Sequence, residues 1–109
     1  MRQLCLALLL LPTPALAQNA PADPALHCAA LSLLSGDILA KAGQASEDDL
    51  AVTREISNLM LLHVQLPTNQ RADALRAHKA QLRKSLSDAE ISAEVAKTGD
   101  TCLDKYVNG

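Results

Sequence analysis

Three histidines and three cysteines are the side chains of this 109-residue chain with the most evident chemistry. Metal ligands on a helix usually stand three or four residues apart, and none of His27, His63 and His78 has a histidine or cysteine at that spacing. No C-x-x-C pair, G-x-S-x-G elbow or glycine-rich loop occurs either. The sequence therefore predicts no metal site, no cofactor and no catalytic centre, and we expect the protein not to be an enzyme.

His63 differs from the other two histidines because its neighbours at helical spacing are apolar. A lone histidine on such a stripe is more often a satisfied core or boundary residue than a ligand. If burial keeps His63 neutral, its pKa lies below the unfolded value of about 6.5, and acid would destabilise the fold. We therefore treat His63 and nearby Met60 as candidate pH-sensing or pocket residues.

The N-terminus has the three parts of a signal peptide: a positive start with Arg2, an apolar run over residues 4–11, and Ala15-Leu16-Ala17 as a cleavage site. A membrane span needs about 20 apolar residues, so this run is too short for a permanent anchor. We expect cleavage of residues 1–17, a flexible leader over 18–23 and a single helical domain over 24–109. The predicted location is the periplasm or the extracellular space.

Removal of the signal peptide leaves two cysteines, Cys28 and Cys102. In an oxidising compartment an even pair is expected to form a disulfide. The core has no Phe or Trp, and Tyr106 is the only aromatic residue apart from histidine. A small aliphatic core of this kind is marginally stable, so a disulfide from Cys28 to Cys102 fits the composition.

Charge and aromatic content exclude a nucleic-acid partner. The chain has 10 basic and 12 acidic residues, and the densest basic stretch, over 71–84, is interrupted by Asp73 and alanines. Nucleic-acid binding needs a clustered basic surface, and unpaired bases need aromatic rings for stacking. The stretch is typical of a solvated helix face.

Apolar periodicity predicts helices throughout the domain and no strands. The first helix is expected from Pro24 to about residue 42. The second starts after a capping Ser46, ends before Pro67, and should be the most buried helix. A third starts at 68 or 69, Ser87 separates it from a fourth, and residues 98–100 end the fourth before a short terminal helix. The fold class is all-α, a small antiparallel bundle of four to five short helices stapled by one disulfide.

The layout of signal peptide, short helices and one disulfide is similar to that of periplasmic acid-stress chaperones and of small helical immunity proteins. Residues 86–90 (LSDAE) also resemble an LTxxQ repeat, with Glu90 in place of the glutamine and no second copy. We expect a non-catalytic exported protein that acts by protein–protein interaction, as a stress chaperone, inhibitor or immunity protein. Its partner would be another periplasmic or secreted protein. The alternative is a carrier of a small apolar ligand or metal in a cavity between helices.

Overall fold

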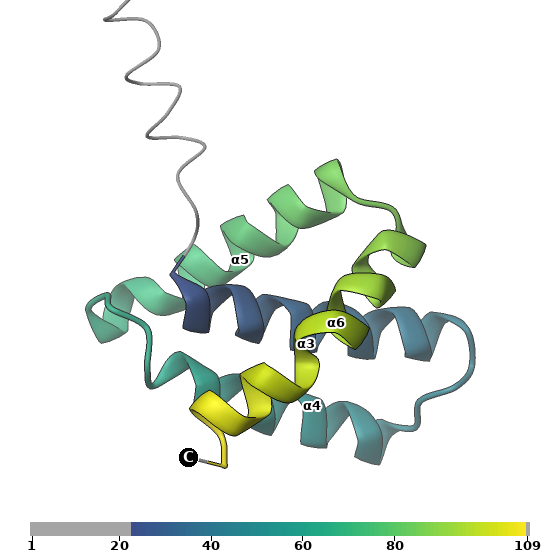
Figure 1. Cartoon of the computed structure of the whole chain (residues 1–109), viewed down its shortest axis with the longest axis horizontal. Coiled ribbons are helices and arrows are strands. Elements are labelled where there is room, and N and C mark those ends of the chain that lie inside the picture. The colour runs from purple at the N-terminus through teal and green to yellow at the C-terminus, as the bar shows by residue number, and fades with distance from the viewer. Residues whose placement is uncertain (1–22, 109) are drawn as a thin grey trace, which may run out of the picture.

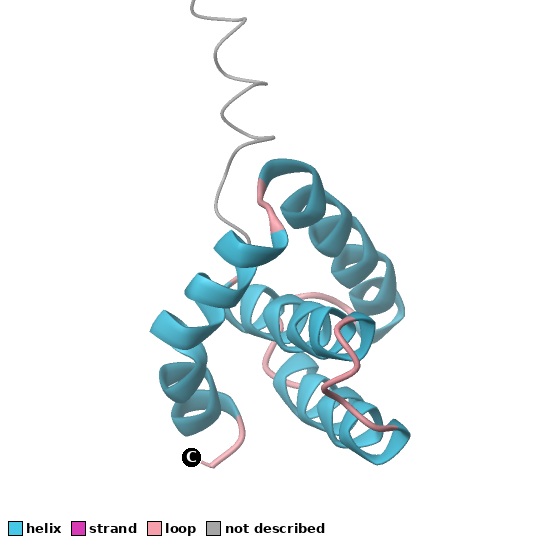
Figure 2. Ribbon diagram, turned by 90° about the vertical axis from the view of Figure 1, so that its right-hand side faces the viewer, coloured by secondary structure: helices cyan, strands magenta, loops and turns pink. Residues whose placement is uncertain are grey.

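The computed structural model describes residues 23–108, which contain four α-helices (Figure 1). They are α3 (Pro24–Lys41), α4 (Glu47–Leu61), α5 (Thr68–Ser85) and α6 (Asp88–Tyr106). Short loops join them, and this range contains no strand (Figure 2). The predicted all-α class is confirmed. The predicted signal peptide (1–17) and the leader up to residue 22 lie outside the described residues.

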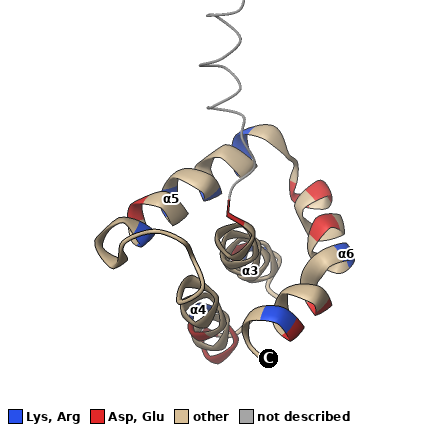
Figure 3. Ribbon diagram, turned by 60° about the vertical axis from the view of Figure 1, so that its left-hand side comes forward, with Lys and Arg blue, Asp and Glu red and all other residues tan. Residues whose placement is uncertain are grey.

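Helix α3 occupies the centre of the fold. Viewed nearly along its axis, α4, α5 and α6 surround it, and each packs mainly on α3 rather than on the others (Figure 3). Most of the fully buried side chains belong to α3, whereas α4 buries only Ser57 and Met60. The prediction that the second helix is the most buried is therefore wrong. Small residues on several sides of α3, such as Ala25, Ala29 and Ala30, allow three helices to approach it closely.

Both ends of α3 follow from local sequence. Pro24 occupies the first helical position, and Asp23 Oδ1 accepts hydrogen bonds from the amides of Ala25 (2.9 Å) and Leu26 (3.4 Å). The helix ends just before Gly43, whose φ of +73° lies in the left-handed region that favours glycine. The predicted start and end of the first helix are thus confirmed.

The crossing of α3 with α4 is close because Gly36 has no side chain. A Cβ at this position would lie 3.0 Å from Thr53 Cγ2, which is too near for an ordinary contact. Further along the same interface, the buried Ser57 hydroxyl donates to the carbonyl of Ala29 over 3.2 Å. The buried Ser57 side chain is therefore satisfied, and the interface tolerates a hydroxyl in a core of aliphatic residues.

The break before α6 is confirmed at Ser87. The Ser87 hydroxyl accepts from the Glu90 amide (3.2 Å), while a Glu90 carboxylate oxygen accepts from the Ser87 amide (2.9 Å). The predicted end at residues 98–100 is wrong, because α6 continues through Gly99 to Tyr106. A glycine inside a helix costs only about 1 kcal/mol. The inward stripe of α6, which includes Ile91, Val95 and Cys102, outweighs that cost by packing on α3.

The Cys28–Cys102 disulfide joins α3 to α6 and confirms the predicted bridge. The bridge lies against Met60 of α4, in one of three clusters of buried side chains. The other two clusters also contain α3 residues, with Leu34 at the centre of one and Leu26 in the other. Every part of the core therefore depends on α3.

Candidate functional site

The two candidate residues from the sequence differ in their surroundings. Met60 is buried and packs beside the disulfide. His63 is exposed, because α4 ends at Leu61 and Val64, at 3% exposure, takes the inward position in the turn that follows. The His63 ring instead lies beside Tyr106, with 5.3 Å between ring centroids. The burial on which pH sensing by His63 depends is therefore not present.

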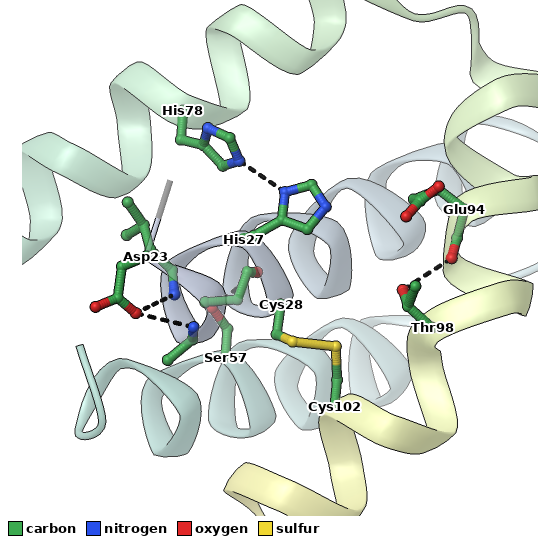
Figure 4. Close-up of a disulfide and its surroundings, with 11 residues drawn as sticks. Asp23, His27, Cys28, Ser57, His78, Glu94, Thr98 and Cys102 are labelled. Atoms are coloured by element: carbon green, nitrogen blue, oxygen red, sulfur yellow. Dashed lines mark hydrogen bonds between the residues drawn. A yellow bond between two sulfur atoms is a disulfide. The ribbon is translucent and has the colours of Figure 1, made fainter. Parts of the chain in front are cut away.

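A second histidine arrangement was not foreseen from the sequence. His27 on α3 and His78 on α5 point toward each other, with 2.8 Å between His27 Nδ1 and His78 Nε2 (Figure 4). Burial, and to a smaller extent the neighbouring His27, lowers the pKa of the half-buried His78 below its ordinary value. The two residues are 51 apart in sequence, so only the packing of α5 on α3 reveals the pair.

The geometry of this pair is that of a hydrogen bond rather than a metal chelate. The ring centroids are 5.1 Å apart, which is close to the largest separation that a 2.8 Å nitrogen–nitrogen contact permits, so the nitrogens meet head-on. A chelated metal needs both lone pairs to converge on a third point. Within residues 23–108, no group of three or more His, Cys, Asp or Glu side chains is placed to hold a metal ion.

A cavity of about 180 Å³ lies between α3, α4 and α6. Its buried floor includes both half-cystines, Leu31 and Met60, and its rim is half-exposed. The full lining is Cys28, Leu31, Ser32, Ser35, Thr53, Ile56, Met60, Val95, Thr98, Gly99, Cys102 and Leu103. Of the two residues singled out from the sequence, Met60 lines this cavity and His63 does not.

The outer side of α4 carries an apolar surface. Among the described residues, four large hydrophobic side chains are exposed, and three of them are Val52 (54%), Leu59 (40%) and Leu62 (67%). Positions 52, 59 and 62 share one side of a helical wheel, and we call these three residues the α4 face. The fourth exposed residue, Leu39 (41%), lies on α3. The sequence had suggested that this leucine-rich helix would be buried, whereas much of its apolar surface is open.

Similarity to known proteins does not indicate a function for this chain. No protein-family model, curated protein or solved structure matches the chain. None of the helices in residues 23–108 combines the length and the hydropathy needed to cross a membrane. The α4 face, the cavity and the histidine pair are therefore the features from which function is inferred.

Charge is distributed unevenly around α3. Helix α5 carries five basic residues and one aspartate, whereas α4 carries four carboxylates and one arginine, and α6 five carboxylates and two lysines (Figure 3). Several α5 cations are already paired, for example Lys79 and Arg83 with Asp37 of α3 at 3.7 and 3.5 Å. The acidic surplus thus lies on the helices that carry the α4 face and frame the cavity.

Proposed function

We propose that the chain is an exported, non-catalytic protein that binds a basic, apolar segment of another protein through the α4 face. The observation that supports this most is the concentration of exposed Val52, Leu59 and Leu62 on one side of one helix. Scattered exposed aliphatic residues are normal on protein surfaces, but grouped ones mark interaction sites. Their spacing suits an amphipathic partner helix whose apolar stripe lies along α4.

Charge favours a basic partner. Glu55 projects from the same side of α4 as the α4 face, and the first turn of α4 adds Glu47, Asp48 and Asp49. Asp49 is engaged in the helix cap, where its hydrogen bonds to Ser46 lower its pKa and keep it ionised. A partner with lysines or arginines beside its apolar stripe would gain attraction and faster association, whereas an acidic partner would be repelled.

The proposed location is the periplasm or the extracellular space. A structural disulfide is typical of oxidising compartments, and the sequence of residues 1–17 has the features of a cleavable signal peptide. The intact mass of the protein recovered from an osmotic-shock fraction tests this directly. A mass corresponding to residues 18–109 with one disulfide is expected, and full-length protein retained in the cytoplasm would contradict export.

Binding can be tested with a synthetic 18-residue amphipathic helix that has leucines on one side and lysines on the other. Isothermal titration calorimetry should detect binding to the protein, and a peptide with glutamates in place of the lysines should bind at least tenfold more weakly. The Leu59→Ser variant should weaken binding of the lysine peptide. Leu39→Ser is the matched control, because Leu39 and Leu59 are almost equally exposed, at 41% and 40%.

Two results would count against the α4 face. One is the absence of binding by the lysine peptide at concentrations where it stays monomeric. The other is equal weakening by Leu39→Ser and Leu59→Ser, because that would indicate a nonspecific hydrophobic effect. Both substitutions replace exposed side chains, so the variants are expected to remain folded, which circular dichroism would verify.

A further inference from the structure

We propose that the cavity between α3, α4 and α6 binds a small, uncharged and mostly apolar molecule that carries one hydrogen-bond-accepting oxygen. The cavity is a specific candidate site for the alternative function predicted from the sequence, that of a carrier of a small apolar ligand. It is separate from the α4 face, since none of Val52, Leu59 and Leu62 lines the cavity. Binding of a small molecule in the cavity can therefore be tested independently of polypeptide binding to the α4 face.

The walls of the cavity are held in place before any ligand arrives. The disulfide fixes Cys28 of α3 and Cys102 of α6 with their Cα atoms 5.7 Å apart (Figure 4). Met60 of α4 packs in the same buried cluster as both cysteines. Ligand sites in proteins are usually largely preformed and predominantly apolar, with a few polar groups that set orientation. The floor of this cavity fits that description.

The volume limits the size of the ligand. An engineered apolar protein cavity of about 150 Å³ binds benzene, so a cavity of about 180 Å³ suits a ligand of similar or slightly larger size. Longer chains or fused rings would have to extend past the half-exposed rim. The favoured ligands are therefore single-ring or short branched molecules.

The polar side chains of the lining indicate an accepting group on the ligand. The Thr98 hydroxyl donates to the carbonyl of Glu94 (2.8 Å), and that of Thr53 to the carbonyl of Asp49 (2.9 Å), so both donors are used within their own helices. Ser32 and Ser35 are half-buried and line the cavity, and within residues 23–108 neither hydroxyl takes part in a hydrogen bond. These serines are three apart on α3 and share one side, where they can both donate to a carbonyl or ether oxygen.

Charge excludes anions of the same size. The two outer helices around the cavity are both acidic in sum, and Asp100 directly follows Gly99 of the lining. Lys97 and Lys105 of α6 do not line the cavity. A carboxylate would lose its hydration in an apolar site without gaining a cationic partner. A neutral ketone should therefore bind better than the corresponding acid.

Cyclohexanone and cyclohexanecarboxylate are suitable probes because they share a ring and differ in charge. Titration followed by methyl NMR should give saturable shifts for Leu31, Ile56 and Val95 with cyclohexanone, and at least tenfold weaker binding of the carboxylate. The methyl groups of Leu66, which packs in the cluster with Leu26 and Val64 and does not line the cavity, should not shift. The double variant Ser32→Ala/Ser35→Ala should weaken binding of cyclohexanone while leaving that of cyclohexane unchanged.

Gly99 allows the cavity to be filled without disrupting the fold. A Cβ built there meets only Val95 Cγ1, at 3.9 Å, so a leucine at this position has room to enter the cavity. We expect Gly99→Leu to abolish cyclohexanone binding while raising the melting temperature. Gly99→Ala is the control, since it brings the same gain in helix propensity without filling the space, and it should retain binding.

Three outcomes would overturn the proposal: no saturable shift up to the solubility limit of cyclohexanone, unchanged binding by Gly99→Leu, or tighter binding of the carboxylate. Native mass spectrometry of the protein isolated from its own compartment gives a complementary readout. A bound mass of the size of a single-ring molecule would support the site.

Discussion

Removal of the Cys28–Cys102 disulfide should cause a large loss of stability. The two half-cystines are 74 residues apart in sequence, so the bridge closes most of the domain into one loop. In the chain-entropy model such a cross-link restricts the unfolded chain, and for a loop of about 75 residues it contributes about 4.5 kcal/mol at 25 °C. A domain of about 90 residues is stable by roughly 5–13 kcal/mol in total. The variant Cys28→Ala/Cys102→Ala should therefore lose a third or more of its stability.

Urea unfolding followed by circular dichroism measures this loss directly. Three forms are compared: the oxidised protein, the same protein reduced with a phosphine, and the double alanine variant. The reduced protein keeps both sulfur atoms in the core, so its difference from the oxidised form isolates the cross-link. The additional loss in the alanine variant reports packing around the bridge. The dependence of the unfolding free energy on urea should steepen without the bridge, since the unfolded chain then exposes more surface.

A difference of less than about 1 kcal/mol between the unfolding free energies of the reduced and oxidised proteins would contradict this stabilisation by the cross-link. That result would mean that the unfolded chain is already compact enough for the bridge to restrict it little. A loss in the alanine variant alone, with none on reduction, would assign the effect to packing instead of chain entropy.

Three further predictions concern single side chains. The lowered pKa of His78 means that the unfolded state takes up protons more readily than the folded state does. The stability that the neutral His78 ring contributes is therefore complete above pH 6.5 or so and is lost as the pH falls through the lowered pKa. Urea unfolding at pH 7.5 and 5.0 should show a smaller drop in unfolding free energy for His78→Gln than for the native protein, and equal drops would contradict this role. Ser87→Ala removes the cap of α6 and should lower the free energy of unfolding, measured with urea, by about 1 kcal/mol. If Ser87→Ala lowered it by the same amount in a Glu90→Ala background, the two side chains would not form a shared capping box. Gly36→Leu should destabilise by about 1–3 kcal/mol because α4 leaves no room for a side chain, and a stable variant with an unshifted Thr53 methyl signal would show that the crossing is looser than described.

Local signals in the sequence were sufficient for most helix boundaries. Asp23 and Pro24 predict the start of α3, and Ser87 with Glu90 predicts the start of α6, because capping depends on residues only two or three apart. The helix end that local signals predict at residues 98–100 is wrong. Packing of the α6 stripe on α3 decides that the helix continues, and no local pattern contains that information.

The candidate site was only partly predictable for the same reason. The pairing of Cys28 with Cys102 follows from arithmetic if Cys5 is discounted as part of the predicted signal peptide, and the structure contains the bridge. The expected burial of His63 assumed that α4 runs past residue 61, and the helix ends there. The contact of His27 with His78 joins two helices, so it depends on how α5 lies on α3 and could not be read from spacing.

The central position of α3 has a consequence for the order in which the chain is assembled. It is the first of the described helices to be synthesised, yet the residues that cover it come from all three later helices, as far along as Cys102. Until those residues have emerged, α3 has apolar surface without a partner, and exposed surface of this kind promotes aggregation of incomplete chains. Any chain ending before residue 102 would lack the bridge and the last turns of α6 that pack beside it, so the cluster around Cys28 is completed only by the last residues of the sequence.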